Sequence, residues 1–465
     1  MFKKIRNIHF VGIGGSGMSG IAEVLITLGY QVSGSDLKET ETVNRLRNLG
    51  GKIYIGHRES NIKDSDVVVV STAIDATNPE VTAAIREKIP VIPRIEMLAE
   101  LMRLKYGVAI AGTHGKTTTT SLVAVVLAKG GLDPTAIIGG KLNNIGSHAK
   151  LGQGEFLVAE ADESDGSFLK LTPTISVITN IDDDHLDYWQ TIENIHKAFV
   201  EFANKVPFYG SVIVCGDDPG VHKIINQIKR KYITYGLAVN GASNCDLIAH
   251  NIESAGFGTD FDVTFNEIML GRVRLNVPGL HNVYNALAAI GVGLELGLPF
   301  DTITAGLNEF KGVARRLQLK GEEKKIIVMD DYGHHPTEIK ATLAALRRYW
   351  NKKLVVIFQP HRFSRTKILA DEFAGAFQQA DELVVMDIYS AGEKFVPGVT
   401  AQLVIDKIKG TGYDRVQYLP GKQDVLDQLA SKLQPETLVL TLGAGDVWKV
   451  GEELLERLKQ KSDKF

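Results

Sequence analysis

The hydrophobic residues of this chain form short runs that alternate with helical patterns. Residues 67–70 and 108–111 are continuous apolar runs, and residues 8–11 are apolar except for His9; all three have the length of strands buried on both faces. A turn rich in glycine or polar residues follows such runs, and then come apolar residues spaced three and four apart, as in residues 21–28. Buried strands that alternate with helices are typical of an α/β fold with mostly parallel sheets.

The composition excludes several classes of protein. Hydrophobic residues make up 44% of the chain, charged residues 23%, and the formal net charge is −3, which argues against general affinity for nucleic acids or anionic membranes. Cys215 and Cys245 lack metal-site spacing and are too few for a disulfide framework. No apolar stretch approaches the roughly 18 residues of a membrane span. We therefore expect a cytoplasmic protein without membrane insertion or a nucleic-acid partner.

The first predicted strand runs into a glycine-rich turn, Gly12 to Gly17, and then into a helix. Gly-x-Gly-x-x-Gly in this context is typical of a site for a dinucleotide or a pyrophosphate, and Asp36 follows the next predicted strand. Two other interpretations stay open. In one, Asp36 serves the ribose of a nicotinamide cofactor, and in the other, the glycines only shape the turn.

A second glycine turn predicts a phosphate site. Gly112 and Gly115 lie between a predicted strand and a helix that begins at Lys116. Backbone N–H groups and the helix dipole would face phosphate oxygens there, with Lys116 near the β/γ-phosphates and the Thr117 hydroxyl near magnesium. The first glycine of the common pattern is replaced by Ile110, so the loop is a variant. The alternative is an ordinary turn.

Acidic residues and a histidine follow the next two predicted strands. Residues 160–165 come after one strand, and residues 180–185, ending in His185, come after the other. In a parallel sheet these ends lie on the same edge as the phosphate loop, where oxygen ligands would meet magnesium bound to ATP. Solvated acidic loops are the alternative.

Three further features suggest ligand contacts. Asn282 and Asn285 stand at the start of a predicted helix, where their side chains can cap the helix or pair with a base edge. Arg316 could neutralise a phosphoryl group or lie on the surface. Near the C-terminus, residues 330–336 and 359–366 follow strands and carry histidines and arginines. Such residues suit a crevice that binds a carboxylate, although caps and surface charges would give the same pattern.

These patterns together predict three domains. Residues 1–105 and 316–465 should each form a Rossmann-like α/β domain. Residues 106–315 should form a P-loop-type central ATPase domain with a mostly parallel sheet. In residues 244–278 of this domain, apolar and polar residues alternate and glycines interrupt the pattern. This predicts a small antiparallel appendage.

Seven motifs in this order resemble those of the Mur ligases of bacterial peptidoglycan synthesis. The resemblance covers essentially the full length and implies an ATP-dependent ligase that joins L-alanine to the lactyl carboxylate of UDP-N-acetylmuramate through an acyl phosphate. ATP and Mg²⁺ would be its cofactors, and a monomer or weak homodimer its assembly. The motifs are Gly12–Gly20, Gly112–Thr118, Glu160–Asp165, Asp184-His185, His281–Asn285, Asp330–Pro336 and Gln359–Arg365.

The resemblance also implies roles for single residues. The nucleotide-sugar would lie at Gly14, Gly15, Ser16 and Ser71. The ATP site would comprise Gly112, Thr113, His114, Gly115, Lys116, Thr117 and Thr118, with Asn282 and Asn285 near adenine and with Arg316. Metal ligands would be Thr117, Glu160 and His185. The muramoyl end and alanine would meet Tyr332, His334, Arg362 and Arg365, and the catalytic set would be Lys116, Glu160, His185, His334 and Arg362.

Several alternatives stay open. A murein-peptide ligase would add a preformed tripeptide to the same nucleotide-sugar. A nicotinamide-dependent oxidoreductase would use the first glycine turn but leave Lys116 without a function. A binding protein would take up ATP without turnover. Relatives carry a carbamylated lysine about fifteen residues after the metal histidine, but Val200 stands there and Lys197 is the nearest lysine, so no such modification is assigned.

Overall fold

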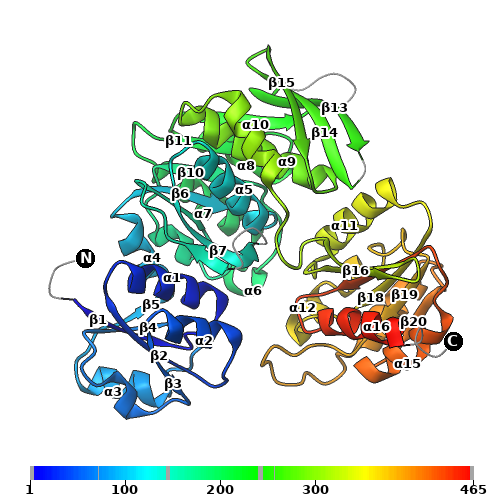
Figure 1. The fold of residues 1–465 in the computed structure, drawn as a ribbon, viewed down its shortest axis with the longest axis horizontal. Helices are drawn as coiled ribbons and strands as arrows, with labels where there is room; N and C mark the ends of the chain where they lie inside the picture. Colours follow the sequence, from blue (N-terminus) through cyan, green and yellow to red (C-terminus); the bar gives the residue numbers. More distant parts are fainter. Residues whose placement is uncertain (1–4, 72, 143–146, 239–243, 256, 461–465) are drawn as a thin grey trace. The chain divides into compact units, whose positions relative to one another are not determined.

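A computed structural model describes residues 5–71, 73–142, 147–238, 244–255 and 257–460 (Figure 1). Contacts divide the chain into two compact units. The first comprises Met1–Ile252, Asp260–Leu275 and Val283–Lys311, and the second comprises Glu253–Thr259, Asn276–Asn282 and Gly312–Phe465. Within the described ranges, no helix is long and apolar enough to cross a membrane.

The N-terminal sheet has five parallel strands in the order β3-β2-β1-β4-β5. This is the Rossmann order, as predicted, and the carboxyl ends of β1 and β4 flank the point where the order reverses. Valines fill the central strand β4, which suits burial on both faces. The strands are β1 (Asn7–Val11), β2 (Gln31–Asp36), β3 (Lys52–Ile55), β4 (Val67–Val70) and β5 (Val91–Pro93). The helices are α1 (Ser16–Thr27), α2 (Glu41–Asn48), η1 (Glu59–Ile62), α3 (Pro79–Arg86) and α4 (Arg94–Met102).

The central sheet has ten strands in the order β15-β14-β13-β12-β11-β10-β6-β9-β7-β8. Parallel pairing runs from β7 through β9, β6, β10, β11 and β12 to β13, and β8 pairs antiparallel with β7. The strands are β6 (Tyr106–Ala111), β7 (Thr135–Leu142), β8 (Ser147–Lys150), β9 (Phe156–Glu160), β10 (Ile175–Ile178), β11 (Ser211–Cys215), β12 (Tyr232–Leu237), β13 (Leu247–Ala255), β14 (Gly258–Phe265) and β15 (Ile268–Leu275).

The predicted appendage is a continuation of this sheet. Strands β13, β14 and β15 extend its edge beyond β12. Asn266 and Glu267 join β14 to β15 with φ angles of 48° and 67°, as in a two-residue type I′ hairpin turn. Such short connections cannot join parallel strands, so this edge is antiparallel.

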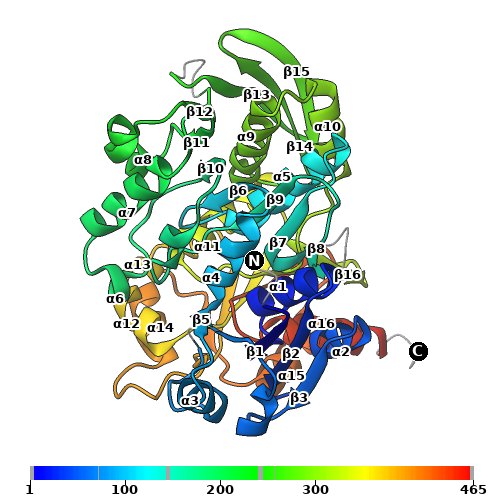
Figure 2. The same cartoon turned by 90° about the vertical axis from the view of Figure 1, so that its left-hand side faces the viewer.

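Helices cover the central sheet. Helix α5 (Lys116–Lys129) follows β6 directly and packs against β7 and against α10 (Phe300–Glu309) (Figure 2). Its inward side chains are apolar, and Leu122, Val126 and Leu127 are fully buried. The other helices are η2 (Ser167–Lys170), α6 (Leu186–Trp189), α7 (Ile192–Asn204), α8 (Pro219–Ile224), η3 (Ile225–Gln227) and α9 (Leu280–Glu295).

The C-terminal sheet has six strands in the order β16-β17-β21-β18-β19-β20, all parallel except the edge strand β16. Its strands are β16 (Gln318–Glu323), β17 (Ile326–Asp331), β18 (Lys353–Phe358), β19 (Glu382–Val385), β20 (Val416–Tyr418) and β21 (Thr437–Leu442). Its helices are α11 (Pro336–Tyr349), α12 (Phe363–Ile368), α13 (Ala370–Phe373), α14 (Ala401–Lys409), α15 (Lys422–Lys432) and α16 (Trp448–Gln460). As predicted, α11 begins at a proline directly after the motif that ends β17.

Candidate active site

The loop from β6 to α5 holds its shape through two glycines in left-handed conformations. Gly112 has a φ of +133°, and a Cβ atom there would lie 2.0 Å from the Thr179 hydroxyl oxygen. Gly115 has a φ of +83°, and its Cβ would lie 2.6 Å from Asn285 Oδ1. Both positions therefore require glycine, for backbone conformation and for space. The turn is built for close approach, as the sequence predicted.

The residues that follow β10 clamp this loop. Asn180 Oδ1 accepts a hydrogen bond from His114 N at 2.8 Å, and Asn180 Nδ2 donates to the His114 carbonyl at 3.0 Å. The Thr179 hydroxyl donates to the same carbonyl at 2.6 Å. The sequence placed this strand end beside the loop but did not single out these two side chains. Their bonds preorganise the loop.

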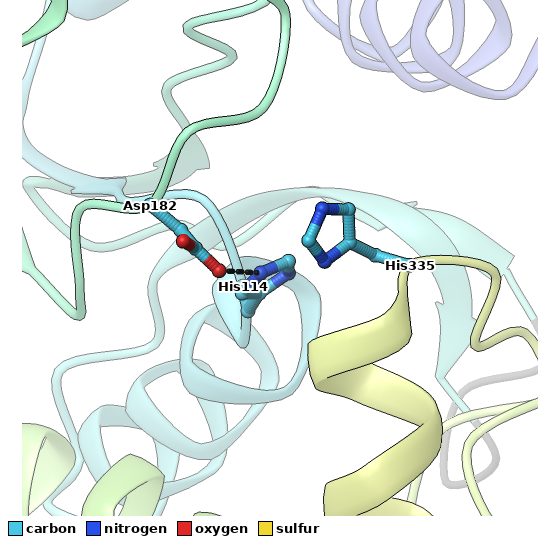
Figure 3. A group of neighbouring side chains, drawn as sticks. All are labelled: His114, Asp182 and His335. Atoms are coloured by element: carbon cyan, nitrogen blue, oxygen red, sulfur yellow. Dashed lines mark hydrogen bonds and ion pairs between the residues drawn. The ribbon is translucent and has the colours of Figure 1, made fainter. Parts of the chain in front are cut away.

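Thr113 and His114 have further partners at the same strand end. The Thr113 hydroxyl accepts from Asp182 N at 2.9 Å, and His114 Nε2 lies 3.2 Å from Asp182 Oδ2 (Figure 3). The hydrogen bond to His114 lowers the pKa of the Asp182 carboxyl. This carboxylate is therefore ionised at neutral pH and orients the His114 ring.

Lys116, the first residue of α5, points back over the loop. Its Nζ donates to the carbonyls of Gly112 at 2.6 Å and Thr113 at 3.2 Å, and it meets Glu163 Oε2 at 2.8 Å and Oε1 at 3.0 Å. Burial lowers the pKa of Lys116, but the neighbouring carboxylates, Glu163 foremost, outweigh burial and raise it. Lys116 thus holds a positive charge at the loop between β6 and α5. Glu163 was part of a predicted acidic motif but had no predicted role of its own.

The predicted metal ligands lie in the neighbourhood of this ion pair. Glu160 ends β9 opposite Ile110 of β6, and its charge acts on Lys116. Thr117 stands in the first turn of α5, and Thr118 behind it is buried. His185 Nε2 lies 4.0 Å from Glu163 Oε1, on a backbone with a φ of 58°. The structure therefore brings Glu160 and His185 to the same region as Lys116.

The glycine turn of the N-terminal domain is anchored to the end of β2. The Ser35 carbonyl accepts from Gly12 N at 2.8 Å and from Ile13 N at 3.0 Å, and Asp36 Oδ2 accepts from Gly14 N at 2.9 Å. Asp36 thus shapes the turn. Gly15 is exposed and precedes the first residue of α1, Ser16, whose side chain lies outside the described part of the structure.

Two further residues border that turn. Ser71 follows β4 directly, at the carboxyl edge of the sheet, as predicted. Arg94, which the sequence analysis did not select, lies so close to Gly17 that a Cβ there would be 2.7 Å from its guanidinium nitrogen. Arg94 therefore places a positive charge beside the first turn of α1, where an anionic ligand is also favoured by the helix dipole.

The two asparagines at the start of α9 are both buried, and the side chains of both form hydrogen bonds. Asn282 Nδ2 donates to the Pro278 carbonyl at 2.7 Å. Asn285 Oδ1 accepts from the Thr119 hydroxyl of α5 at 3.0 Å. Asn285 therefore lies directly against the phosphate loop. Asn282 orders the turn that starts its own helix.

In the second unit, two arginines lie on one tyrosine ring. The guanidinium carbons of Arg315 and Arg316 are 4.9 Å and 5.3 Å from the centre of the Tyr332 ring. Arg315 Nε also donates to the buried Asp330 Oδ2 at 3.1 Å, and Arg316 pairs with Glu338 at 3.5 Å. Arg315 was not a predicted site residue. Its ion pair holds the start of this unit against β17.

Three further aromatic rings form a row with that tyrosine. Tyr332 meets His334 edge-on at 5.5 Å, His334 lies 5.8 Å from His361, and Tyr389 stacks on His361 at 5.8 Å with an angle of 9°. Burial and the charge of Arg365 lower the pKa of His361 to about 4, and burial lowers that of His334 to about 3. Both imidazoles are therefore neutral at pH 7.

The predicted arginine pair flanks these rings. The Arg365 guanidinium lies 3.3 Å from His361 Nδ1, whereas the side chain of Arg362 is exposed. The backbone of Arg362 bonds to Tyr389, whose carbonyl accepts from Arg362 N at 2.8 Å. The structure thus gathers all four predicted residues, Tyr332, His334, Arg362 and Arg365, at the carboxyl ends of β17 and β18.

Comparison with protein families gives three matches along the chain. Residues 7–106 match the family model described as "Mur ligase family, catalytic domain", residues 110–293 match "Mur ligase middle domain", and residues 315–445 match "Mur ligase, glutamate ligase domain". The UDP-N-acetylmuramate–L-alanine ligase of Geotalea uraniireducens (strain Rf4) is 56% identical over 459 residues, which cover 99% of both chains. The chain belongs to the Mur ligase family.

Other Mur ligases agree with this assignment. The UDP-N-acetylmuramate–L-alanine ligase of Geobacter sulfurreducens is 55% identical and covers 99% of both chains. The crystal structure of the UDP-N-acetylmuramate–alanine ligase MurC of Thermotoga maritima has a TM-score of 0.83 at 30% identity, covering 98% of this chain and 99% of its own. A murein peptide ligase of Psychrobacter arcticus shares the fold, with a TM-score of 0.72 at 24% identity over 97% and 98% of the two chains. The three-domain α/β fold predicted from the motifs is thereby confirmed.

Proposed function

We propose that this Mur ligase joins L-alanine to the lactyl carboxylate of UDP-N-acetylmuramate with hydrolysis of ATP to ADP and phosphate. The preformed loop around Lys116 carries the proposal, because its two required glycines and its buried lysine suit a polyphosphate. Relatives that share more than half of their residues with this chain over its full length bear the name of this activity.

The chemistry has two steps. The lactyl carboxylate attacks the γ-phosphorus, ADP leaves, and an acyl phosphate forms. The amine of L-alanine then attacks the acyl carbon and phosphate leaves, which forms the amide. Both steps bring anions together, so Lys116 and the N–H groups of Gly112–Thr118 would reduce their repulsion. Arg316, if it reaches the same phosphates, would add to this.

The donor atoms near Lys116 fit Mg²⁺. The Thr117 hydroxyl and the Glu160 carboxylate are oxygen donors, the kind that this cation prefers, and we propose them as its ligands. His185 supplies nitrogen, which suits a second divalent ion better than the first. A bound magnesium would neutralise charge on the phosphates. The chain's own part is to hold the carboxylates at the strand ends.

The two outer domains would bind the other substrates. The glycine turn with Gly14, Gly15, Ser16 and Ser71 would hold the nucleotide-sugar. In the second unit, Tyr332, His334, Arg362 and Arg365 would receive the muramoyl end and alanine, since arginines beside neutral imidazoles favour carboxylates. We place adenine near Asn282 and Asn285.

The domain boundaries, the cellular location and the oligomeric state are part of the same proposal. Domain limits at 105/106 and 315/316 agree with family models that end at 106 and begin at 315. The enzyme would act in the cytoplasm, where ATP and nucleotide-sugars are available, as a monomer or weak homodimer.

Phosphate release tests the proposal. The purified chain is given ATP, Mg²⁺, UDP-N-acetylmuramate and L-alanine, each omitted in turn, and the series is repeated with Lys116→Ala. Release that needs all four components and disappears in the variant supports the proposal. Absence of release from the folded wild-type protein would contradict it and favour a nucleotide-binding protein without turnover.

The same assay distinguishes an L-alanine ligase from a murein-peptide ligase. A murein-peptide ligase would release phosphate with the tripeptide as acceptor and not with L-alanine. The murein peptide ligase of Psychrobacter arcticus is 24% identical and shows the fold alone, whereas relatives named for L-alanine reach 56%. Preference for the tripeptide would reverse the assignment. Titration with NADH, followed by its fluorescence, tests the oxidoreductase.

A further inference from the structure

The second glutamate of the acidic loop, Glu163, makes a close contact for which the proposed chemistry has no use. Both of its oxygens lie within 3.0 Å of Lys116 Nζ. Its side chain is only 3% exposed, against 16% for the lysine, so water screens this pair weakly. Glu163 is therefore the principal counter-ion of the lysine assigned to the phosphates.

A hydrogen bond to its backbone carbonyl helps to fix the position of Glu163. The Glu163 carbonyl accepts a hydrogen bond from Trp189 Nε1 at 2.9 Å. The same carboxylate also lies near His185, whose Nε2 is 4.0 Å from Oε1. Glu163 is thus close both to Lys116 and to the histidine proposed for a metal.

We propose that Glu163 is a positioning residue that competes with nucleotide phosphate for Lys116. This inference rests on the proposed function, because it takes Lys116 as a phosphate ligand. A polyphosphate that reaches Lys116 meets a buried anion already bound to it, so the two negative groups must share the cation or Glu163 must turn away. Glu163 thereby keeps the charged lysine folded over its loop and weakens binding of nucleotide that arrives without a metal ion.

Calorimetric binding of ATP in EDTA tests this competition, with wild-type protein, Glu163→Gln and Asp165→Asn. Glutamine keeps the shape of Glu163 and removes its charge, so we expect ATP to bind about tenfold tighter to the variant. Asp165 belongs to the same loop and accepts a hydrogen bond from Ser167 N at 3.0 Å, which asparagine can also accept. That control should stay within about twofold of the wild type.

AMP distinguishes competition at Lys116 from a general change of the loop. Its single phosphate does not extend to the β/γ position, so its affinity should be equal in the wild type and in Glu163→Gln. If glutamine prevents folding, Glu163→Asp keeps the charge but shortens the reach to Lys116, and ATP should bind about threefold tighter.

Two results would overturn the inference while leaving the proposed ligase intact. One is ATP affinity in EDTA that is unchanged or weaker in the folded Glu163 variants. The other is an equal gain for ATP and AMP. If the wild type binds no nucleotide at all and releases no phosphate, both the inference and the proposed function fail.

Discussion

The side-chain amide of Asn180 makes two hydrogen bonds to the backbone of His114, one to N at 2.8 Å and one to O at 3.0 Å. An amide just after β10 thus satisfies both backbone groups of one residue in the loop between β6 and α5. The loop acquires its shape from a neighbouring strand as well as from its glycines. Its rigidity is therefore a property of the sheet.

Asn180→Ala should impair ATP use selectively. Losing both bonds leaves His114 N without this acceptor and loosens the loop, so we expect the KM for ATP to rise about tenfold. The KM for UDP-N-acetylmuramate should change less than about twofold, because its proposed site lies on another sheet. Steady-state phosphate release measures both constants. A wild-type KM for ATP in the folded variant would show that the clamp is dispensable.

Gly112→Ala and Gly131→Ala separate backbone strain from lack of space. Both glycines have positive φ angles, +133° and +76°, but only the Cβ at Gly112 would collide, since nothing lies within 4 Å of the one at Gly131. Gly131→Ala should cost about 1 kcal/mol of stability and keep its activity. Gly112→Ala should reduce kcat/KM for ATP by at least about 100-fold.

Thermal unfolding and phosphate release check the pair of glycine variants. Equal losses of activity in the two variants would mean that the left-handed backbone conformation, and not the lack of space, accounts for the effect. Near-normal activity of Gly112→Ala would mean that Thr179 can move aside, and the loop would then be more adaptable than its hydrogen bonds suggest.

The elements that surround the site could be predicted because each has a local cause. Continuous apolar runs gave the central strands, and glycines with a following helix gave both turns around Gly12 and Gly112. Parallel strands end on one edge, so the chain order alone placed residues 160–165 and 180–185 beside Lys116. The order of motifs also identified the family.

The side chains that complete the site could not be chosen in the same way. Residues 160–165 contain four carboxylates, and the path of the chain after β9 decides that Glu163 reaches Lys116. Asn180 and Thr179 looked like ordinary strand-end residues. The edge strands β13–β15 were recognised as strands, but periodicity does not say which neighbour a strand joins. These contacts depend on residues far apart in the sequence.

Removing the ring that covers His361 should raise the pKa of that histidine. Tyr389 stacks on it at 5.8 Å, and burial is the main reason that the His361 pKa falls from 6.5 to about 4. Tyr389→Ala should move the pKa back towards its ordinary value, and Tyr389→Phe, which keeps the ring, should leave it near that of the wild type. Titration of the histidine Cε1–H signals by NMR, assigned with His361→Asn, measures this.

The lowered pKa of His361 determines how the free energy of unfolding changes with pH. Between pH 6.5 and about 4 the unfolded His361 binds a proton that the folded side chain does not, so the free energy of unfolding decreases as pH falls through this window. Above pH 6.5 the side chain is neutral in both states and this destabilisation is absent, and below about pH 4 it is complete. Tyr389→Ala should narrow this pH range, because the folded His361 would take up its proton at a higher pH. A His361 pKa that stays near 4 in this variant would assign the shift to Arg365 and Arg362 instead of the ring.

Glu80 should stabilise the glycine turn of the N-terminal domain through Ser35. The fully buried Glu80 carboxylate accepts from the Ser35 hydroxyl at 2.5 Å and from Asn61 Nδ2 at 2.5 Å, and the Ser35 carbonyl holds the turn at Gly12. Burial alone would raise the Glu80 pKa, but the nearby His9 ring, 3.6 Å away, and the hydrogen bonds from Ser35 and Asn61 outweigh burial and lower the pKa from 4.5 to about 2. Glu80→Gln should therefore lose up to about 3 kcal/mol at pH 7.

The pH dependence of that loss distinguishes charge from shape. The folded pKa lies below the unfolded one, so the contribution of the carboxylate is present above pH 4.5 and is lost as pH falls towards about 2. Hydrogen exchange of the β1 and β2 amides should therefore show a large difference between wild type and Glu80→Gln at pH 7 and a smaller one at pH 3.5. Glu23→Gln, which breaks the surface pair with Arg45 at 2.8 Å, should cost less than about 1 kcal/mol. A Glu80 effect that is equal at both pH values would mean that glutamine disturbs the packing around Ser35, and that the ionised carboxylate itself contributes little to holding the turn.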